Sequence, residues 1–105
     1  MRQENLVLST EIREAFRDFS EGKDLSDSNK SRVGLELHRI NRDVDNDHYQ
    51  YMNGFLDEDF YQTTTIDEIR HYAPLWRKLG INETREAFTA EVNRILAGAA
   101  TLKSH

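Results

Sequence analysis

The fold of this chain is decided by residues 26–54, which read SDSNKSRVGLELHRINRDVDNDHYQYMNG. Apolar and aromatic side chains recur through this stretch at spacings of three and four, which is the period of an α-helix and not of a β-strand. Ser26 is a residue type that caps helix starts, and Gly54 is the type that ends helices. We therefore predict one long amphipathic helix over about residues 26–53. Its apolar stripe consists of Val33, Leu37, Ile40, Val44, His48 and Tyr51.

A further helix is predicted before the long one. Ile12, Ala15, Phe16 and Phe19 recur at helical spacing, with Ser9 or Thr10 as the cap and Gly22 as the end. The short polar ends of the chain, residues 1–8 and 98–105, are expected to fray. Gly34 lies inside the long helix and costs about 1 kcal/mol relative to Ala, and it could let another helix approach closely.

The second half of the chain predicts two main helices and one short helix. Asp57 is a good N-cap for the third helix, and Pro74 is expected to break that helix because it disfavours helical geometry at the residue before it. A short helix then covers residues 75–79 and is ended by Gly80, and Asn82 caps the last helix. We thus predict an all-α fold, a compact bundle of four main helices plus one short helix in a single domain of residues 1–105. Its expected core comprises Phe16, Phe19, Val33, Leu37, Ile40, Val44, Phe60, Ile69, Phe88, Val92 and Ile95.

Charge and composition exclude several classes of protein. The 105 residues include 19 acidic residues and 14 Lys or Arg, which gives a net charge of -5. Because no basic cluster occurs, we expect neither nucleic-acid binding nor attraction to an anionic membrane. The chain has no cysteine, which suits a reducing compartment. It also has no run of about 18 apolar residues and no signal peptide at its start, so we expect a cytoplasmic protein without a membrane span.

Two pairs of an acidic residue and a histidine are candidate metal ligands. Asp45 and His48 lie three residues apart, as do Glu68 and His71, so each pair shares one helix face. Carboxylate-bridged di-metal bundles use such pairs together with carboxylates from two more helices. With 19 acidic residues, however, such pairs also arise by chance. We expect solvated pairs, no metal and no cofactor, and we keep a metal-binding bundle as an alternative. No nucleophile elbow or phosphate loop occurs, so we do not expect an enzyme.

The aromatic residues give the main functional hypothesis. Three readings of the segment around residues 48–51 stay open: a half-buried face whose Tyr hydroxyls and Gln amide satisfy one another, a pocket of a small-ligand sensor, and a patch that contacts a partner. The aromatic side chains exceed what a thin bundle must bury, which favours a non-enzymatic protein-interaction module. Its partner would be another protein, which could be bound to a membrane, or a second copy of this chain. The candidate interaction residues are Tyr49, Gln50, Tyr51, Phe55 and Trp76.

Four segments also carry a resemblance to a known family. They are EIREAFRDFSEG, LSDSNKSRVGLELHRINRDVDNDHYQYMNGFLDEDFY, the region around Trp76, and EAFTAEVNRIL. In this order they resemble an uncharacterised family of short bacterial helical proteins, over roughly residues 8–96. The resemblance implies a helical fold and no particular activity. Many members carry a transmembrane helix before this domain, which we do not expect here because the domain starts so close to Met1. The matching positions are Arg32, Asp45, Tyr49, Gln50, Gly54, Leu56, Asp57 and Trp76.

Arg32 and Asp45, two of these family-pattern positions, can pair only if the chain folds back on itself. On one straight helix they would lie about 20 Å apart, from the rise of 1.5 Å per residue.

Overall fold

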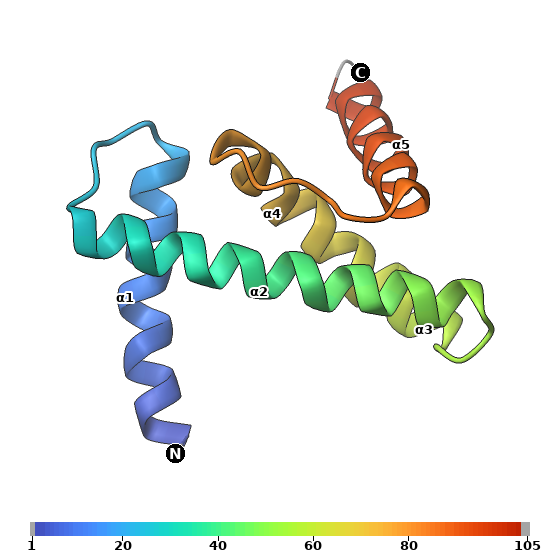
Figure 1. The fold of residues 1–105 in the computed structure, drawn as a ribbon, viewed down its shortest axis with the longest axis horizontal. Coiled ribbons are helices and arrows are strands. Elements are labelled where there is room, and N and C mark those ends of the chain that lie inside the picture. The colour runs from blue at the N-terminus through green and yellow to red at the C-terminus, as the bar shows by residue number, and fades with distance from the viewer. Residues whose placement is uncertain (1, 104–105) are drawn as a thin grey trace. The chain divides into compact units, whose positions relative to one another are not determined.

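The computed structural model describes the backbone of residues 2–103 and the side chains of residues 10–98, and the described residues contain helices and no strand (Figure 1). This confirms the all-α prediction with four main helices. The chain divides into two compact units, residues 1–37 and residues 38–105, and the boundary falls inside the long helix. The elements in order are α1 (Arg2–Ser20), α2 (Asp27–Met52), α3 (Glu58–Phe60), η1 (Tyr61–Thr65), α4 (Ile66–Lys78) and α5 (Glu86–Lys103).

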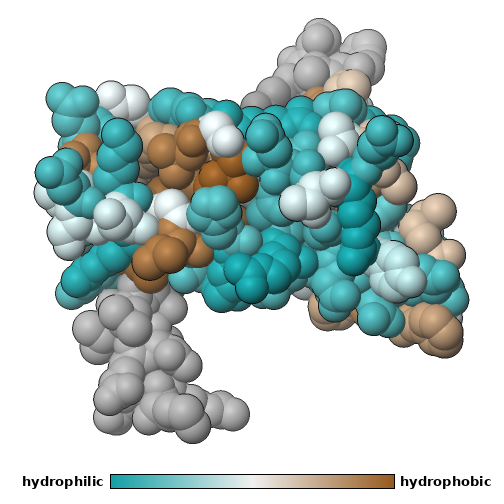
Figure 2. Space-filling model, in the orientation of Figure 1, coloured by the Kyte–Doolittle hydropathy of each residue, from teal (hydrophilic) through white to brown (hydrophobic). Residues whose placement is uncertain are grey.

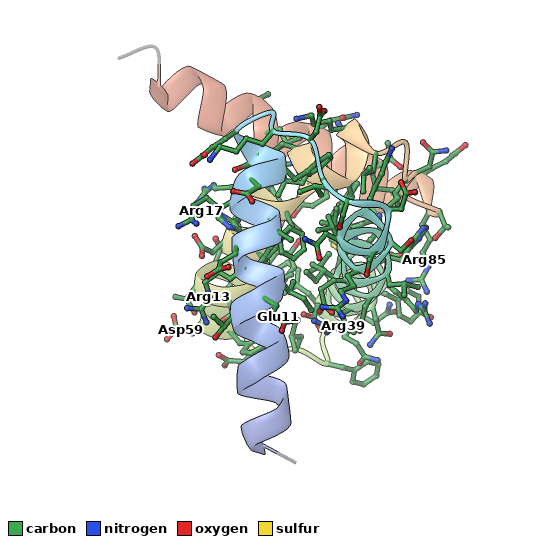
Figure 3. The ribbon with its side chains drawn as sticks, turned by 90° about the vertical axis from the view of Figure 1, so that its left-hand side faces the viewer. Glu11, Arg13, Arg17, Arg39, Asp59 and Arg85 are labelled. Carbon is green, nitrogen blue, oxygen red and sulfur yellow. The ribbon has the colours of Figure 1, made fainter. Side chains whose placement is uncertain are left out.

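The first unit contains α1 and the beginning of α2. The predicted cap of α2 is present, because the Ser26 hydroxyl accepts a hydrogen bond from the Asn29 amide at 3.1 Å. An exposed ion pair joins Arg32 on α2 to Glu11 on α1, where Arg13 and Arg17 also lie (Figure 3). The buried apolar side chains of this unit are Ala15, Phe16, Val33 and Leu37.

Two helix ends differ from the prediction. The first helix begins at Arg2, so neither Ser9 nor Thr10 caps it and residues 2–8 are helical rather than a lead-in. At the other end α5 continues through Gly98 to Lys103. Both segments are rich in strong helix formers and contain no proline, so nothing in the backbone ends the helix at the predicted place. Residues 104 and 105 lie outside the described part of the chain.

The core of the second unit is larger than predicted. Phe60 is exposed, and the neighbouring Tyr61 takes the buried position instead. Trp76, Ile66 and Ala73 are also buried although they were not in the expected core. The buried apolar residues of this unit are Ile40, Val44, Tyr61, Ile66, Ile69, Ala73, Trp76, Ile81, Phe88, Val92 and Ile95.

A turn of π-helix explains the shift from Phe60 to Tyr61. In η1 the amide of Ile66 bonds to the carbonyl of Tyr61, five residues earlier instead of four. The segment contains the three consecutive threonines whose branched side chains weaken an α-helix. Both Tyr61 and Thr65 are buried. The wider turn thus aims these two side chains at the interior.

The predicted break at Pro74 is wrong, because α4 runs from Ile66 to Lys78 with this proline inside it. A proline within a helix removes one backbone hydrogen bond and costs about 3 kcal/mol. Burial of the opposite face offsets that cost, since Ala73 and Trp76 on either side of Pro74 are completely buried. The separate short helix over residues 75–79 is therefore the last part of α4.

The segment after α4 also differs from the prediction. Gly80 has a φ of 82°, and its amide bonds to the Arg77 carbonyl at 3.0 Å, which ends α4 as predicted. The Ile81 amide bonds to the Trp76 carbonyl at 2.9 Å in the same motif. Asn82 is not the cap of the last helix, because α5 begins only at Glu86. The residues between these two helices are held by contacts of their side chains instead.

Candidate functional site

A network of aromatic and acidic side chains fills the interior of the second unit. The Tyr51 and Tyr61 rings stack with their centroids 3.8 Å apart, and the Tyr61 hydroxyl donates to Glu91 at 2.6 Å. The ring of His48 lies 6.3 Å from that of Tyr61. Burial, together with the hydrogen bond to Glu91, raises the pKa of Tyr61. The pKa of Glu91 is lowered, chiefly by a hydrogen bond from Arg94. Tyr61 is therefore a neutral donor to the charged carboxylate of Glu91.

This network gives the segment around residues 48–51 a structural role. The Tyr51 hydroxyl donates to Glu58 at 2.8 Å, so its partner is a carboxylate. Tyr51 and Gln50 are only partly exposed. The polar groups of this segment were expected to satisfy one another, but the Tyr51 hydroxyl bonds to a glutamate of α3 instead.

A second network holds the segment between α4 and α5. Glu83, whose side chain is 5% exposed, accepts a hydrogen bond from the indole of Trp76 and two from the guanidinium of Arg77, at 3.1 and 2.8 Å. Burial alone would raise the pKa of Glu83, but the bonds from Arg77 and Trp76 lower it below its ordinary value. Trp76 is completely buried here, so in this structure it is a core residue and offers no surface to a partner.

The four candidate metal ligands do not form a metal site. His48 is buried and packs against Phe88 at 5.8 Å between ring centroids, whereas His71 is exposed. Burial raises the pKa of Glu68. Asp45 accepts a hydrogen bond from Thr84. Among the described residues, no three His, Asp or Glu side chains gather as metal ligands would, so the metal-binding alternative has no support.

Three positions of the family pattern have structural explanations. Arg32 pairs with Glu11 on α1. The chain therefore does not need to fold back to give Arg32 an acidic partner. Gly54 ends α2 with a φ of 78°, in the conformation that glycine adopts without strain. Asp57 caps α3, as predicted, by accepting a bond from the Phe60 amide at 3.0 Å.

The exposed apolar residues of the second unit lie where α2 leads into α3, and Figure 2 shows apolar side chains on this surface. Phe55 is 79% exposed and Tyr49 is 50% exposed, as is expected of interaction residues. Met52 lies three residues after Tyr49 on the same helix face, and sequence reasoning missed it although this spacing was visible. We call this surface the apolar patch; it consists of Tyr49, Met52, Phe55 and Phe60.

Charged groups surround the apolar patch. The guanidinium of Arg85 lies 4.5 Å above the ring centroid of Tyr49, a cation–π contact. Three consecutive acidic residues, Asp57, Glu58 and Asp59, separate Phe55 from Phe60 and are exposed; Figure 3 shows Asp59 and Arg85 at the surface. None of these three carboxylates forms an ion pair with a residue that the structure describes.

Two further observations bear on the chain as a whole, a search for membrane-spanning helices and comparisons with known proteins. Within residues 2–103, no helix has both the length and the apolar character that crossing a bilayer requires. Comparison with protein families, with curated proteins and with solved structures finds no match to this chain.

Proposed function

We propose that this protein is a non-enzymatic protein-interaction module that binds its partner through the apolar patch. The observation that carries the proposal is the exposure of Phe55, at 79%, in a chain with other apolar side chains exposed beside it. Exposed aromatic residues and methionine are enriched at protein interfaces.

The charges around the patch favour one kind of partner. Asp57, Glu58 and Asp59 add three carboxylates to the border of the patch, and none of them has an ion-pair partner in the described part of the chain. A segment with apolar side chains flanked by Lys or Arg complements such a surface, and the charge attraction would speed its association. A second copy of this chain would bring its own acidic run to the same border. We therefore propose a partner with a basic, apolar segment, located in the cytoplasm as the lack of cysteine favours.

The test compares three baits in pull-downs from the source cells: the wild-type protein, Phe55→Ser and Leu35→Ser. Leu35 is 72% exposed and lies in the other unit, so its variant is a matched control for loss of an exposed apolar side chain. We expect one protein to be retained by the wild type and by Leu35→Ser but not by Phe55→Ser. The purified partner should then bind Phe55→Ser at least about tenfold more weakly, which is about 1.4 kcal/mol.

Two outcomes would contradict the proposal. The first is that Phe55→Ser retains the same proteins as the wild type, which would show that the patch is not the docking site. The second is a partner whose binding is unaffected by Asp59→Lys and by added salt, which would remove the basic character that we infer for it.

A further inference from the structure

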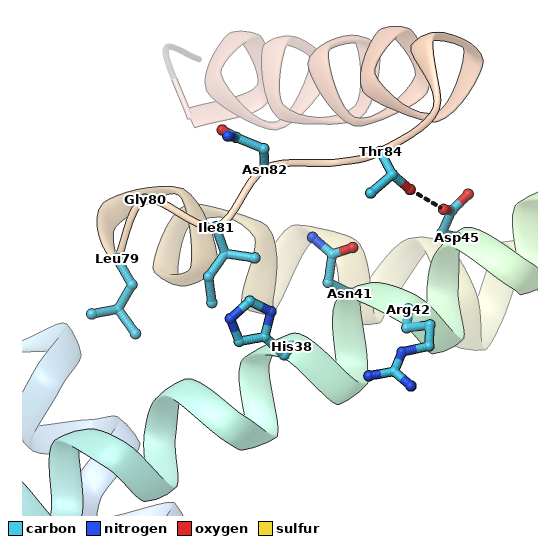
Figure 4. A pocket seen from close by; sticks show the side chains of 9 residues that line it. All are labelled: His38, Asn41, Arg42, Asp45, Leu79, Gly80, Ile81, Asn82 and Thr84. Carbon is cyan, nitrogen blue, oxygen red and sulfur yellow. Dashed lines mark hydrogen bonds between the residues drawn. The ribbon is translucent and has the colours of Figure 1, made fainter.

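A cavity of about 390 Å³ lies in the second unit, away from the residues of the apolar patch. One side is the middle of α2, and the other is the segment that joins α4 to α5 (Figure 4). Aliphatic side chains of Leu79 and Ile81 contribute to its wall. Its volume is in the range of small-molecule pockets, and a single ring compound fits within it.

A buried amide group points into this cavity. Asn41 is only 6% exposed, and its Nδ2 has no hydrogen-bond acceptor among the residues that the structure describes. Figure 4 shows the Asn41 side chain directed from α2 toward the segment with Ile81 and Asn82. Buried amide donors in folded proteins are nearly always paired, so this one identifies a place where a partner group belongs.

A carboxylate lines the same cavity one helical turn further along α2. Asp45 is 6% exposed; its Oδ2 accepts a bond from the Thr84 hydroxyl at 3.2 Å, but its Oδ1 has no hydrogen-bond donor in the described part of the chain. The Arg85 guanidinium lies 3.6 Å from this oxygen, which is an ion pair but too long for a hydrogen bond. The wall of the cavity therefore holds one unused donor and one unused acceptor, and both atoms lie just beneath its surface.

These two groups define the chemistry of a ligand. Because Asn41 and Asp45 are four residues apart, their side chains lie on one face of α2, yet they do not bond to each other. An asparagine amide pairs best with a group that carries an N–H next to an acceptor, as in its bidentate contact with adenine. A second N–H on the same group would satisfy Asp45. A carboxylate ligand has no N–H that it could donate to Asp45 Oδ1, so the preference for an amide rests on hydrogen bonding and not on charge, since Arg42 also lines the cavity.

We infer from this arrangement that the cavity between α2 and the α4–α5 segment binds a small neutral molecule bearing a primary amide or an amino-substituted ring nitrogen, held by Asn41 and Asp45. The cavity and the apolar patch share no lining residue, although Arg85 contacts both Tyr49 and Asp45. Occupation of the cavity does not depend on the function proposed above.

The test uses two probes of nearly equal shape, benzamide and benzoate, added to the ¹⁵N-labelled full chain. We expect benzamide to shift the side-chain NH₂ resonances of Asn41 and the backbone amides of Ile81 and Thr84, and benzoate to leave them unchanged at the same concentration. Asn41→Asp, which replaces the donor with an acceptor, should weaken benzamide binding at least tenfold. Asn46→Asp is the matched control, because Asn46 lies on the same helix but is exposed and outside the cavity. The affinity of the Asn46→Asp variant for benzamide should equal that of the wild type.

Other results would overturn the inference. Equal or stronger binding of benzoate would show an anion site. No shift with either probe up to its solubility limit would show that water alone satisfies Asn41. Both results come from the wild-type chain, so they hold even if Asn41→Asp does not fold. Unchanged benzamide binding by Phe55→Ser would separate this site from the apolar patch.

Discussion

Glu83 shows how much one buried carboxylate can organise. It accepts bonds from Trp76 on the core side and from Arg77 on the solvent side, and so fixes the segment that follows α4. A paired buried charge is costly to break, because removing one partner leaves the other without compensation. The sequence does not predict this network, because nothing near Glu83 in sequence indicates that its partners precede it by six and seven residues.

The pH dependence of stability follows from the lowered pKa of Glu83. A carboxylate with a lowered folded pKa contributes stability above its unfolded pKa and loses that contribution as the pH falls through the folded value. We predict that Glu83→Gln lowers the free energy of unfolding by about 1–3 kcal/mol at pH 7. The difference from the wild type should shrink steadily below the ordinary carboxyl pKa of 4.5. Urea unfolding followed by Trp76 fluorescence at pH 7, 5 and 3 would measure it.

A surface ion pair provides the control for this prediction. Asp43 and Arg39 form an exposed i,i+4 pair with 2.8 Å between their charged atoms. Such pairs contribute little, so Asp43→Asn should change the free energy of unfolding by less than about 0.5 kcal/mol at each pH. A difference between Glu83→Gln and the wild type that stays constant down to pH 3 would contradict the assignment of Glu83 as a charged, paired group.

At the scale of elements, residues with a strong local preference were predicted correctly. Ser26, Asp57 and the three glycines at positions 22, 54 and 80 act as caps or helix ends because their effect depends on the backbone next to them. Pro74 and Asn82 were predicted wrongly for the opposite reason. Their local preference competes with the burial of Trp76 and with the contacts of Glu83, which only the folded chain brings together.

Gly34, inside α2, and Gly54, just after its end, should have opposite effects on stability when each is replaced by Ala. Gly34 lies within α2, and a methyl group added there meets no atom of the described residues within 4 Å, so these residues give no sign of the close helix approach considered from the sequence. Gly34→Ala should therefore raise the free energy of unfolding by about 0.5–1 kcal/mol. Gly54 has equally open surroundings but a φ of 78°, so Gly54→Ala should lower that free energy by about 1–2 kcal/mol.

Denaturant unfolding of both variants would decide this prediction, with the slope m checked to be unchanged. Because neither added methyl group has a neighbour within 4 Å among the described residues, packing against those residues does not account for a difference between the variants. Destabilisation by Gly34→Ala would show that this position needs glycine for a reason other than backbone conformation. A neutral effect of Gly54→Ala would show that the end of α2 can rearrange.

At the scale of the whole molecule, the class of fold was predictable and the candidate sites were predictable only in part. Tyr49 and Phe55 were recognised because aromatic residues in a thin helical chain exceed its core. The cavity at Asn41 was not recognised, since the wall opposite α2 comes from a segment about forty residues later and an asparagine on a polar helix carries no distinguishing pattern. Periodicity reports which face of a helix is buried, but not which of its polar groups lacks a partner.

The state of association of the molecule is the last consequence of its charge pattern. A symmetric contact through the apolar patch would bring Asp57, Glu58 and Asp59 of two copies together, in a chain whose net charge is already -5. Like charges at this border oppose pairing most at low salt, where the Debye length is longest. We predict that the wild-type chain sediments as a monomer of 12.3 kDa at low salt.

The variant Asp59→Lys tests the cause of this behaviour. It removes one negative charge and adds a positive one that can pair with Glu58 of a second copy, so it should dimerise at low salt and dissociate as salt is added. Phe55→Ser placed on top of Asp59→Lys should abolish the dimer, because the apolar contact would be lost. A wild-type dimer at low salt that Phe55→Ser dissociates would contradict the prediction and make a second copy the partner. Added salt should weaken the binding of a basic partner and should strengthen any pairing of wild-type copies. One salt titration therefore distinguishes a basic partner from a second copy of this chain on the apolar patch.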